Sequence, residues 1–241
     1  MISPTRELRD FFTAALVEPV PRDHAETAEQ LVQRRWVCAV TLAIGSFLMA
    51  WTLRISPGDP ALYAATLALG TTWVVGAMTS GKLYLGSANT RTGAGTSRAI
   101  VQALLLGLIL VAVFVAGGLV VANVPVLRDP LLVPLAHARM GVLPIIIGLL
   151  FLNGAAAELF FRGSLYAAVG GQHAVLITTF VFALSVVSTG SPVIITGAAV
   201  LGTVVGLQRR VTGGVLAPII THLTWLTGMV LLLPIALSLW A

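Results

Sequence analysis

Long apolar stretches, separated by short polar segments, dominate the pattern of the chain. Runs without Asp, Glu, Lys or Arg lie at 36–53, 60–81, 99–127, 140–157, 163–208 and 211–241. A helix needs about 20 apolar residues to cross a bilayer, because the hydrocarbon core is about 30 Å thick. The segment 188–192 has the composition of a turn, which divides the fifth run into spans near 165–187 and 192–207, the second of them short. This pattern predicts an all-α, polytopic membrane bundle of about seven transmembrane helices.

The first 35 residues follow a different pattern. Apolar residues recur there with helical spacing, at Leu8, Phe11, Phe12, Ala15 and Leu16. We predict an amphipathic helix that lies on the inner leaflet or against the bundle. Asp23 and Glu26 suggest a capping box that opens a second helix into the first span. The predicted organisation is an amphipathic cytoplasmic segment over residues 1–35 and an integral membrane domain over residues 36–241.

Composition supports the membrane assignment and excludes other classes. Only 10% of the 241 residues are charged, whereas soluble domains have about 25%, and disordered chains are polar. The single cysteine, Cys38, excludes an intramolecular disulfide and a cysteine-based zinc site. Despite a net charge of +5, no basic cluster is interleaved with aromatic residues, so we expect a lipid bilayer and no nucleic acid as partner. The excess of arginine over lysine, with Lys82 alone, favours a GC-rich bacterial source and therefore the plasma (inner) membrane.

The basic residues gather on one side of the seven-span arrangement. The side that holds the N-terminus has eight of them: Arg34, Arg35, Lys82, Arg91, Arg98, Arg162, Arg209 and Arg210. The opposite side has three: Arg54, Arg128 and Arg139. Because cytoplasmic ends of spans carry an excess of Lys and Arg, this distribution predicts an inside N-terminus and an outside C-terminus.

Glu158 is the only acidic residue after Asp129, and it lies in an apolar span. An ionisable group at membrane depth is costly unless it is paired or faces water, so such a group is a candidate for function. Arg162 follows four residues later on the same helix face, in the favoured order for an ion pair. The alternative interpretation is a structural salt bridge that closes a helix end.

His222 is the one histidine deep inside a predicted span. A neutral imidazole can act as a general base or as a metal ligand. The alternative is a histidine that forms a structural hydrogen bond between helices. Pro218, four residues earlier, removes a helix hydrogen bond and favours a kink that opens a cavity.

These residues lie in motifs that resemble those of a known family. The sequence Glu158-Leu-Phe-Phe-Arg162-Gly resembles the second half of the EExxxR motif of the CPBP family, which contains CAAX prenyl endopeptidases and bacteriocin-processing, Abi-type intramembrane proteases. Phe182-Ala-Leu-Ser-Val186 is similar to its FxxxH motif, and the segment from Gly206 to His222 is similar to its third motif, HxxxN. The three motifs occur in order within residues 155–226. The resemblance implies an intramembrane hydrolase fold of bacterial type.

Three positions depart from the family pattern. Ala157 replaces the first glutamate, Val186 the second-motif histidine, and Leu226 the third-motif asparagine. The resemblance implies that the first glutamate and the second-motif histidine activate water, while the third-motif histidine and asparagine stabilise the oxyanion. Carried over to this chain, the catalytic candidates are Glu158, Arg162 and His222. The resemblance also implies a divalent metal, but the chain offers two ligands where a catalytic zinc normally takes three.

Two functions are consistent with these residues. The first is an intramembrane CAAX-type endopeptidase that hydrolyses peptide bonds of a peptide or membrane-protein substrate. The second is a catalytically silent membrane scaffold or regulator with the same fold. A small transporter fits less well, since the sequence has no pair of broken helices in matching halves.

The charge distribution makes a topological prediction. A reporter that is active only outside the inner membrane should be active when fused after Ala241, and inactive when fused before Met1. The physical reason is the retention of basic span ends in the cytoplasm. An inactive C-terminal fusion, with a cytoplasmic reporter active at the same site, would show that the number of spans is wrong.

Overall fold

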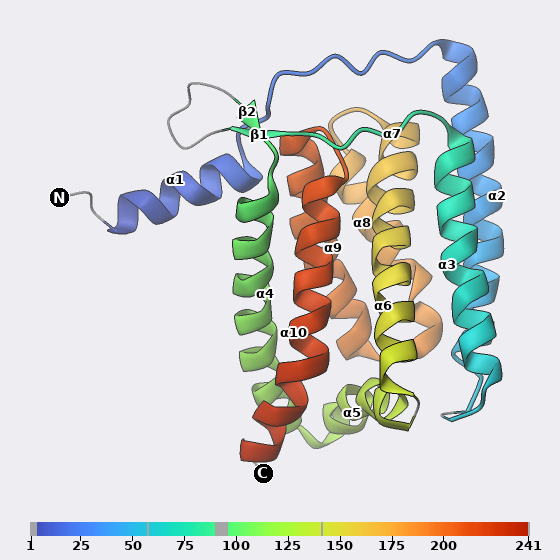
Figure 1. The fold of residues 1–241 in the computed structure, drawn as a ribbon, viewed down its shortest axis with the longest axis vertical. Helices are drawn as coiled ribbons and strands as arrows, with labels where there is room; N and C mark the ends of the chain where they lie inside the picture. Colours follow the sequence, from blue (N-terminus) through green and yellow to red (C-terminus); the bar gives the residue numbers. More distant parts are fainter. Residues whose placement is uncertain (1–3, 57, 90–95, 141, 241) are drawn as a thin grey trace.

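The protein is a bundle of long, nearly parallel and antiparallel helices (Figure 1). The computed structural model describes residues 4–56, 58–89, 96–140 and 142–240. Within them, six helical stretches are long and apolar enough to cross a membrane. These stretches are Ala28–Thr52 (α2), Ala61–Ser80 (α3), Ile100–Ala122 (α4), Pro144–Val169 (α6 to α7), Pro192–Thr212 (α9) and Leu216–Leu239 (α10). The predicted class, an all-α polytopic membrane bundle, is confirmed.

The remaining elements are shorter. Among the described residues, three helices lie outside the set of six: Pro4–Leu16 (α1), Pro125–Met140 (α5) and Ala174–Ser185 (α8). The fourth spanning stretch consists of Leu143–Glu158 (α6), a π-helical turn over Leu159–Leu165, and Tyr166–Val169 (α7). A 3₁₀ turn covers Val187–Thr189, and α10 extends to Trp240. Two short antiparallel strands, Ala88–Asn89 (β1) and Thr96–Ser97 (β2), pair in the connection between α3 and α4.

The sequence assigned the short span to the wrong helix. The expected short span at 192–207 is α9, which has 21 residues, whereas the span expected at 165–187 corresponds mainly to α8, which has 12. At 1.5 Å per residue α8 is about 18 Å long, less than the hydrocarbon thickness. Capping explains the length of α9, because the Ser191 hydroxyl accepts from Ile194 N and Gly213 ends the helix with φ of +71°. The helix therefore includes Arg209 and Arg210, whereas the expected span ended before these charged residues.

The N-terminal region contains the predicted amphipathic helix. It is α1, whose apolar Ala15 is buried and whose Leu8 remains 56% exposed as the helix projects from the bundle (Figure 1). The expected capping box at Asp23 and Glu26 is wrong, since α2 begins at Ala28 and is capped by Thr27 with Gln30. The reason lies in Glu26, whose carboxylate pairs with Arg34 of α2 instead.

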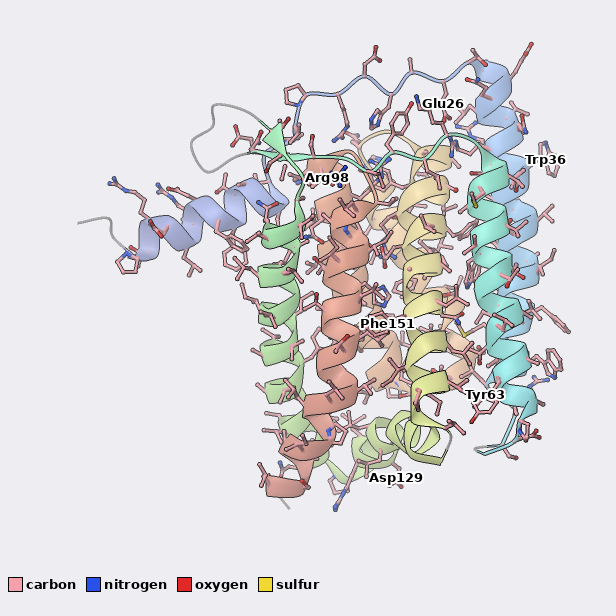
Figure 2. All side chains as sticks on the ribbon, in the orientation of Figure 1. Glu26, Trp36, Tyr63, Arg98, Asp129 and Phe151 are labelled. Carbon is pink, nitrogen blue, oxygen red and sulfur yellow. The ribbon has the colours of Figure 1, made fainter. Side chains whose placement is uncertain are left out.

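The segment between α1 and α2, Val17–Thr27, crosses one end of the bundle, and we name it the strap (Figure 1). We call this end the strap end. Glu26 and Arg98 lie at this end, and Tyr63 and Asp129 lie toward the other (Figure 2). At that opposite end α5 forms a helix where the sequence predicted only a connection with Arg128 and Arg139.

Close backbone packing holds the turn between α9 and α10 at the strap end. The segment after α3 runs along this turn, with Val215 N donating to Tyr84 O (2.9 Å), Leu216 N to Leu85 O (3.0 Å) and Ser87 N to Thr212 O (3.0 Å). A Cβ atom on Gly214 would lie 2.0 Å from the Leu85 carbonyl carbon and 2.1 Å from Gly86 N. Because backbone atoms cannot rotate away, only glycine fits this position.

We therefore expect Gly214→Ala to destabilise the protein by about 1–3 kcal/mol or more, as overpacking does in well-packed interiors. The thermal unfolding temperature in detergent measures the effect. Gly117→Ala is the matched control, because a Cβ there meets nothing within 4 Å and alanine is a better helix former than glycine. Equal melting temperatures for Gly214→Ala and the wild type would contradict the close packing of this turn.

Candidate functional site

Glu158 ends α6 in the interior of the bundle, with no exposed surface. The chain continues from it into the π-helical turn Leu159–Leu165, in which Tyr166 N donates to Phe161 O five residues back. Such a turn is wider than an α-helical one, and π-helical turns occur frequently at functional sites. It shifts the register of all following residues relative to Glu158.

Arg162 lies within the π-helical turn and is also fully buried. Its Nε atom is 3.4 Å from Glu158 Oε2, so the ion pair predicted from the sequence is confirmed. Arg162 Nη2 also donates to the carbonyl oxygen of Gly202 on α9, at 2.9 Å. Its guanidinium carbon lies 4.6 Å from the centre of the Phe182 ring on α8, a cation–π arrangement. The side chain thus connects three membrane helices.

His222, on α10, completes the cluster. Its Nδ1 atom lies 2.7 Å from Glu158 Oε1 although 64 residues separate the two positions. If Glu158 is ionised, Nδ1 must carry the proton of this hydrogen bond, since a carboxylate only accepts. The structure therefore brings together all three residues that the sequence singled out. We call Glu158, Arg162 and His222 the polar core.

Small residues and a side-chain hydrogen bond position the helix that carries His222. The Thr221 hydroxyl donates to Ala103 O on α4 at 2.9 Å. One turn away, a Cβ on Gly107 of α4 would lie 2.6 Å from the Thr224 side chain, so α4 and α10 approach closely. Close approach through glycine is a common mode of helix packing in membranes. The imidazole is thereby fixed opposite Glu158.

Arg209 is a member of this neighbourhood that sequence reasoning missed. Its Nε atom donates to the carbonyl oxygen of Arg162 at 2.6 Å, and its guanidinium lies 5.0 Å from the Tyr166 ring centre. The side chain is buried, with 5% exposed, and it braces the π-helical turn from α9. The sequence assigned Arg209 to membrane topology alone, because nothing in its spacing relates it to a turn 47 residues earlier.

The three departures from the family pattern are apolar contacts in the structure. Ala157 and Val186 pack against the hydrophobic cluster that contains Phe160 and Phe161. Leu226 lines a cavity of about 40 Å³ together with Phe151 and Val230. None of these three side chains can accept or donate a hydrogen bond. The polar core is therefore surrounded by hydrocarbon at the positions where the family motifs have polar groups.

The polar core does not fit a catalytic divalent metal. Its two possible ligands, Glu158 and His222, are joined directly through a 2.7 Å hydrogen bond. In the described part of the chain, no three His, Cys, Asp or Glu side chains come together. A catalytic zinc normally has three protein ligands with an open position between them. The residues present therefore do not form the metal site that the resemblance implies.

Comparison with known proteins matches the part of the chain from α5 to α10. Residues 139–227 match the Rce1-like family, described as type II CAAX prenyl endopeptidase Rce1-like. Searches of curated proteins and of solved structures find no match. Residues 139–227 are therefore a CPBP-family region with a CAAX-type intramembrane protease-like fold, and this region contains all three residues of the polar core.

Proposed function

We propose that this protein is a catalytically silent membrane scaffold or regulator built on the CAAX-type protease-like fold. The observation that carries the proposal is that both carboxylate oxygens of Glu158 are buried and face groups of the chain itself. Oε1 is bonded to His222, and Oε2 faces Arg162. With 0% of its surface exposed, the carboxylate is directed toward its own helices.

Peptide hydrolysis requires a base within hydrogen-bond reach of a water molecule, together with donors aimed at the developing oxyanion. Glu158 Oε2 forms no hydrogen bond, but it lies 3.4 Å from Arg162 Nε and has no exposed surface, so a water molecule could reach it only if the ion pair or the helices around it opened. Breaking a buried ion pair in a low-dielectric interior is costly, because it leaves an uncompensated charge. The apolar side chains at 157, 186 and 226 provide no replacement. These contacts support a structural role for the polar core.

One feature favours a second candidate, an active intramembrane endopeptidase. A carboxylate hydrogen-bonded to one ring nitrogen of a histidine orients the other nitrogen, and this arrangement is a common way to position a general base. The Glu158–His222 bond has this geometry, and His222 is 7% exposed, unlike the other two members of the polar core. In this mechanism Glu158 orients, His222 Nε2 takes the proton of water, and Arg162 holds the carboxylate.

The structural role predicts a large effect of Arg162 on stability. Arg162→Ala removes one partner of a buried pair, which typically costs about 3–5 kcal/mol. We expect a much lower unfolding temperature in detergent for Arg162→Ala than for Arg128→Ala, whose side chain is exposed on α5. Similar unfolding temperatures for the two variants would show that Arg162 does not stabilise the polar core.

If the protein is catalytically silent, as we propose, the purified protein should hydrolyse prenylated and unprenylated peptides very weakly or not at all. Each positioned acid or base contributes about 10²- to 10⁴-fold, and losses within one catalytic unit are not additive. We expect Ala157→Glu alone to remain inactive, because its imidazole partner is still missing. Ala157→Glu combined with Val186→His is the smallest change that restores both groups of the family motif.

The same assay separates the two candidates. Cleavage by the wild type that His222→Ala abolishes, with folding retained, would support the endopeptidase and contradict the silent scaffold. Arg128→Ala is the control for nonspecific effects, since its side chain is remote from the polar core at the opposite end of the bundle. Cleavage that persists at the same rate in His222→Ala would not depend on His222 and would contradict the mechanism in which His222 is the base.

A further inference from the structure

The strap is fixed to the α9–α10 turn by its first half. Val20 N donates to Val211 O at 2.9 Å, and the Val20 side chain is only 4% exposed. Arg22 Nη1 donates to the carbonyl oxygen of Arg210, and Arg210 Nη2 donates back to Leu16 O at 3.1 Å. These reciprocal bonds hold residues 16–22 against the end of α9.

A buried ion pair fixes the other half of the strap. Arg34 of α2, with 1% of its surface exposed, donates through Nε to Glu26 Oε2 at 3.0 Å. The same guanidinium donates to the Ser80 hydroxyl at 3.2 Å and to Lys82 O at 3.1 Å, both at the end of α3. The strap is therefore anchored to three helices and spans the strap end between them (Figure 1).

Between the two anchors, contact with the bundle depends on a histidine. The His24 ring stacks on the Tyr84 ring, with centroids 3.7 Å apart and planes inclined by 15°. A Cβ on Gly213 would lie 3.4 Å from His24 Cε1, so the imidazole also packs on the α9–α10 turn. This histidine has no role in the polar core. Because histidine is the side chain that changes its charge near neutral pH, the charge state of His24 affects how well the strap fits.

The surroundings of His24 are predominantly positive. Arg22 of the strap, Arg209 of α9 and Lys82 after α3 all disfavour the protonated form of His24. Among the described residues, the acidic group that favours it is Asp23. Lys82 also lies 5.1 Å from the centre of the Tyr84 ring on which His24 stacks. A protonated imidazole would therefore add a fourth cation to this site.

We propose that the strap is a pH-sensitive latch, closed over the α9–α10 turn while His24 is neutral and released when His24 becomes protonated. Release exposes the end of α9 and Gly213, which lies nine residues before His222. This device is independent of whether the polar core catalyses a reaction. Its trigger is acidification of the aqueous phase that bathes the strap end.

The direction of the pH effect follows from linkage. Partial burial, and then Arg209 and Arg22, lower the pKa of His24 below its ordinary value, while Asp23 opposes them. When the strap is open, His24 lies in water, where the pKa of an imidazole is about 6.5. The open state then binds a proton that the closed state excludes, so closure is favoured above this pH and lost as the pH falls below it. Between pH 7.5 and 5.5 the ratio of open to closed strap rises by up to about tenfold.

Hydrogen–deuterium exchange of the full-length protein in detergent tests the latch. The readout is the exchange of residues 17–27, corrected for the intrinsic rate at each pH, and it includes the Val20 amide bonded to Val211 O. We expect protection of the strap to fall by up to about tenfold from pH 7.5 to 5.5. Histidine is the side chain whose ordinary pKa lies inside this pH range.

Two variants identify the responsible group. His24→Phe keeps an aromatic ring on Tyr84 but cannot become charged, so its strap should stay protected at both pH values. His173→Phe, at an exposed histidine before α8, should respond as the wild type does. A second uncharged variant, His24→Gln, replaces His24→Phe if the latter does not fold. The proposal is overturned by a wild-type strap insensitive to pH, by an equal response in the uncharged variants, or by a parallel loss of protection in α6 and α10.

Discussion

A carboxylate with no contact to water sets the main constraint on this fold. Glu158 lies among apolar helices, where an unpaired charge costs several kcal/mol. Its compensation comes from Arg162 on the following turn and from His222 on the last helix. Because His222 is 64 residues from Glu158 in the sequence, pairing requires α6, the π-helical turn and α10 to occupy fixed relative positions. The contacts of Glu158 therefore specify the arrangement of these helices and also stabilise it.

The π-helical turn is the element that makes this arrangement possible. It places Arg162 where one guanidinium contacts Glu158, the carbonyl of Gly202 and the face of Phe182. A Cβ on Gly202 would lie 2.9 Å from Arg162 Nη2, so the glycine leaves the space that the guanidinium fills. Arg209, also on α9, donates a hydrogen bond to the carbonyl of Arg162. The wide turn is thus held by two arginines and one glycine.

The sequence was sufficient for features that depend on local spacing or on composition. The apolar runs predicted the helices, and the i, i+4 spacing predicted the Glu158–Arg162 pair. The Glu158–His222 bond, the π-helical turn and the brace from Arg209 depend on how distant helices pack, which periodicity does not encode. The error over α8 and α9 has a related cause. A charged residue was assumed to end a membrane helix, whereas Arg209 is buried and finds a carbonyl acceptor inside the bundle.

The same physics explains how a polar core can persist without catalysis. Removing Glu158 leaves Arg162 as a buried cation without its ion-pair partner, and removing Arg162 leaves a carboxylate held by one imidazole. Each single change is therefore costly to the fold, whatever the protein does. Ala157, Val186 and Leu226 are under no such constraint, since each contacts hydrocarbon and an apolar side chain suits that environment. In this chain the charge network is present and positions 157, 186 and 226 are apolar, and the stability of the fold is a sufficient physical reason for both features.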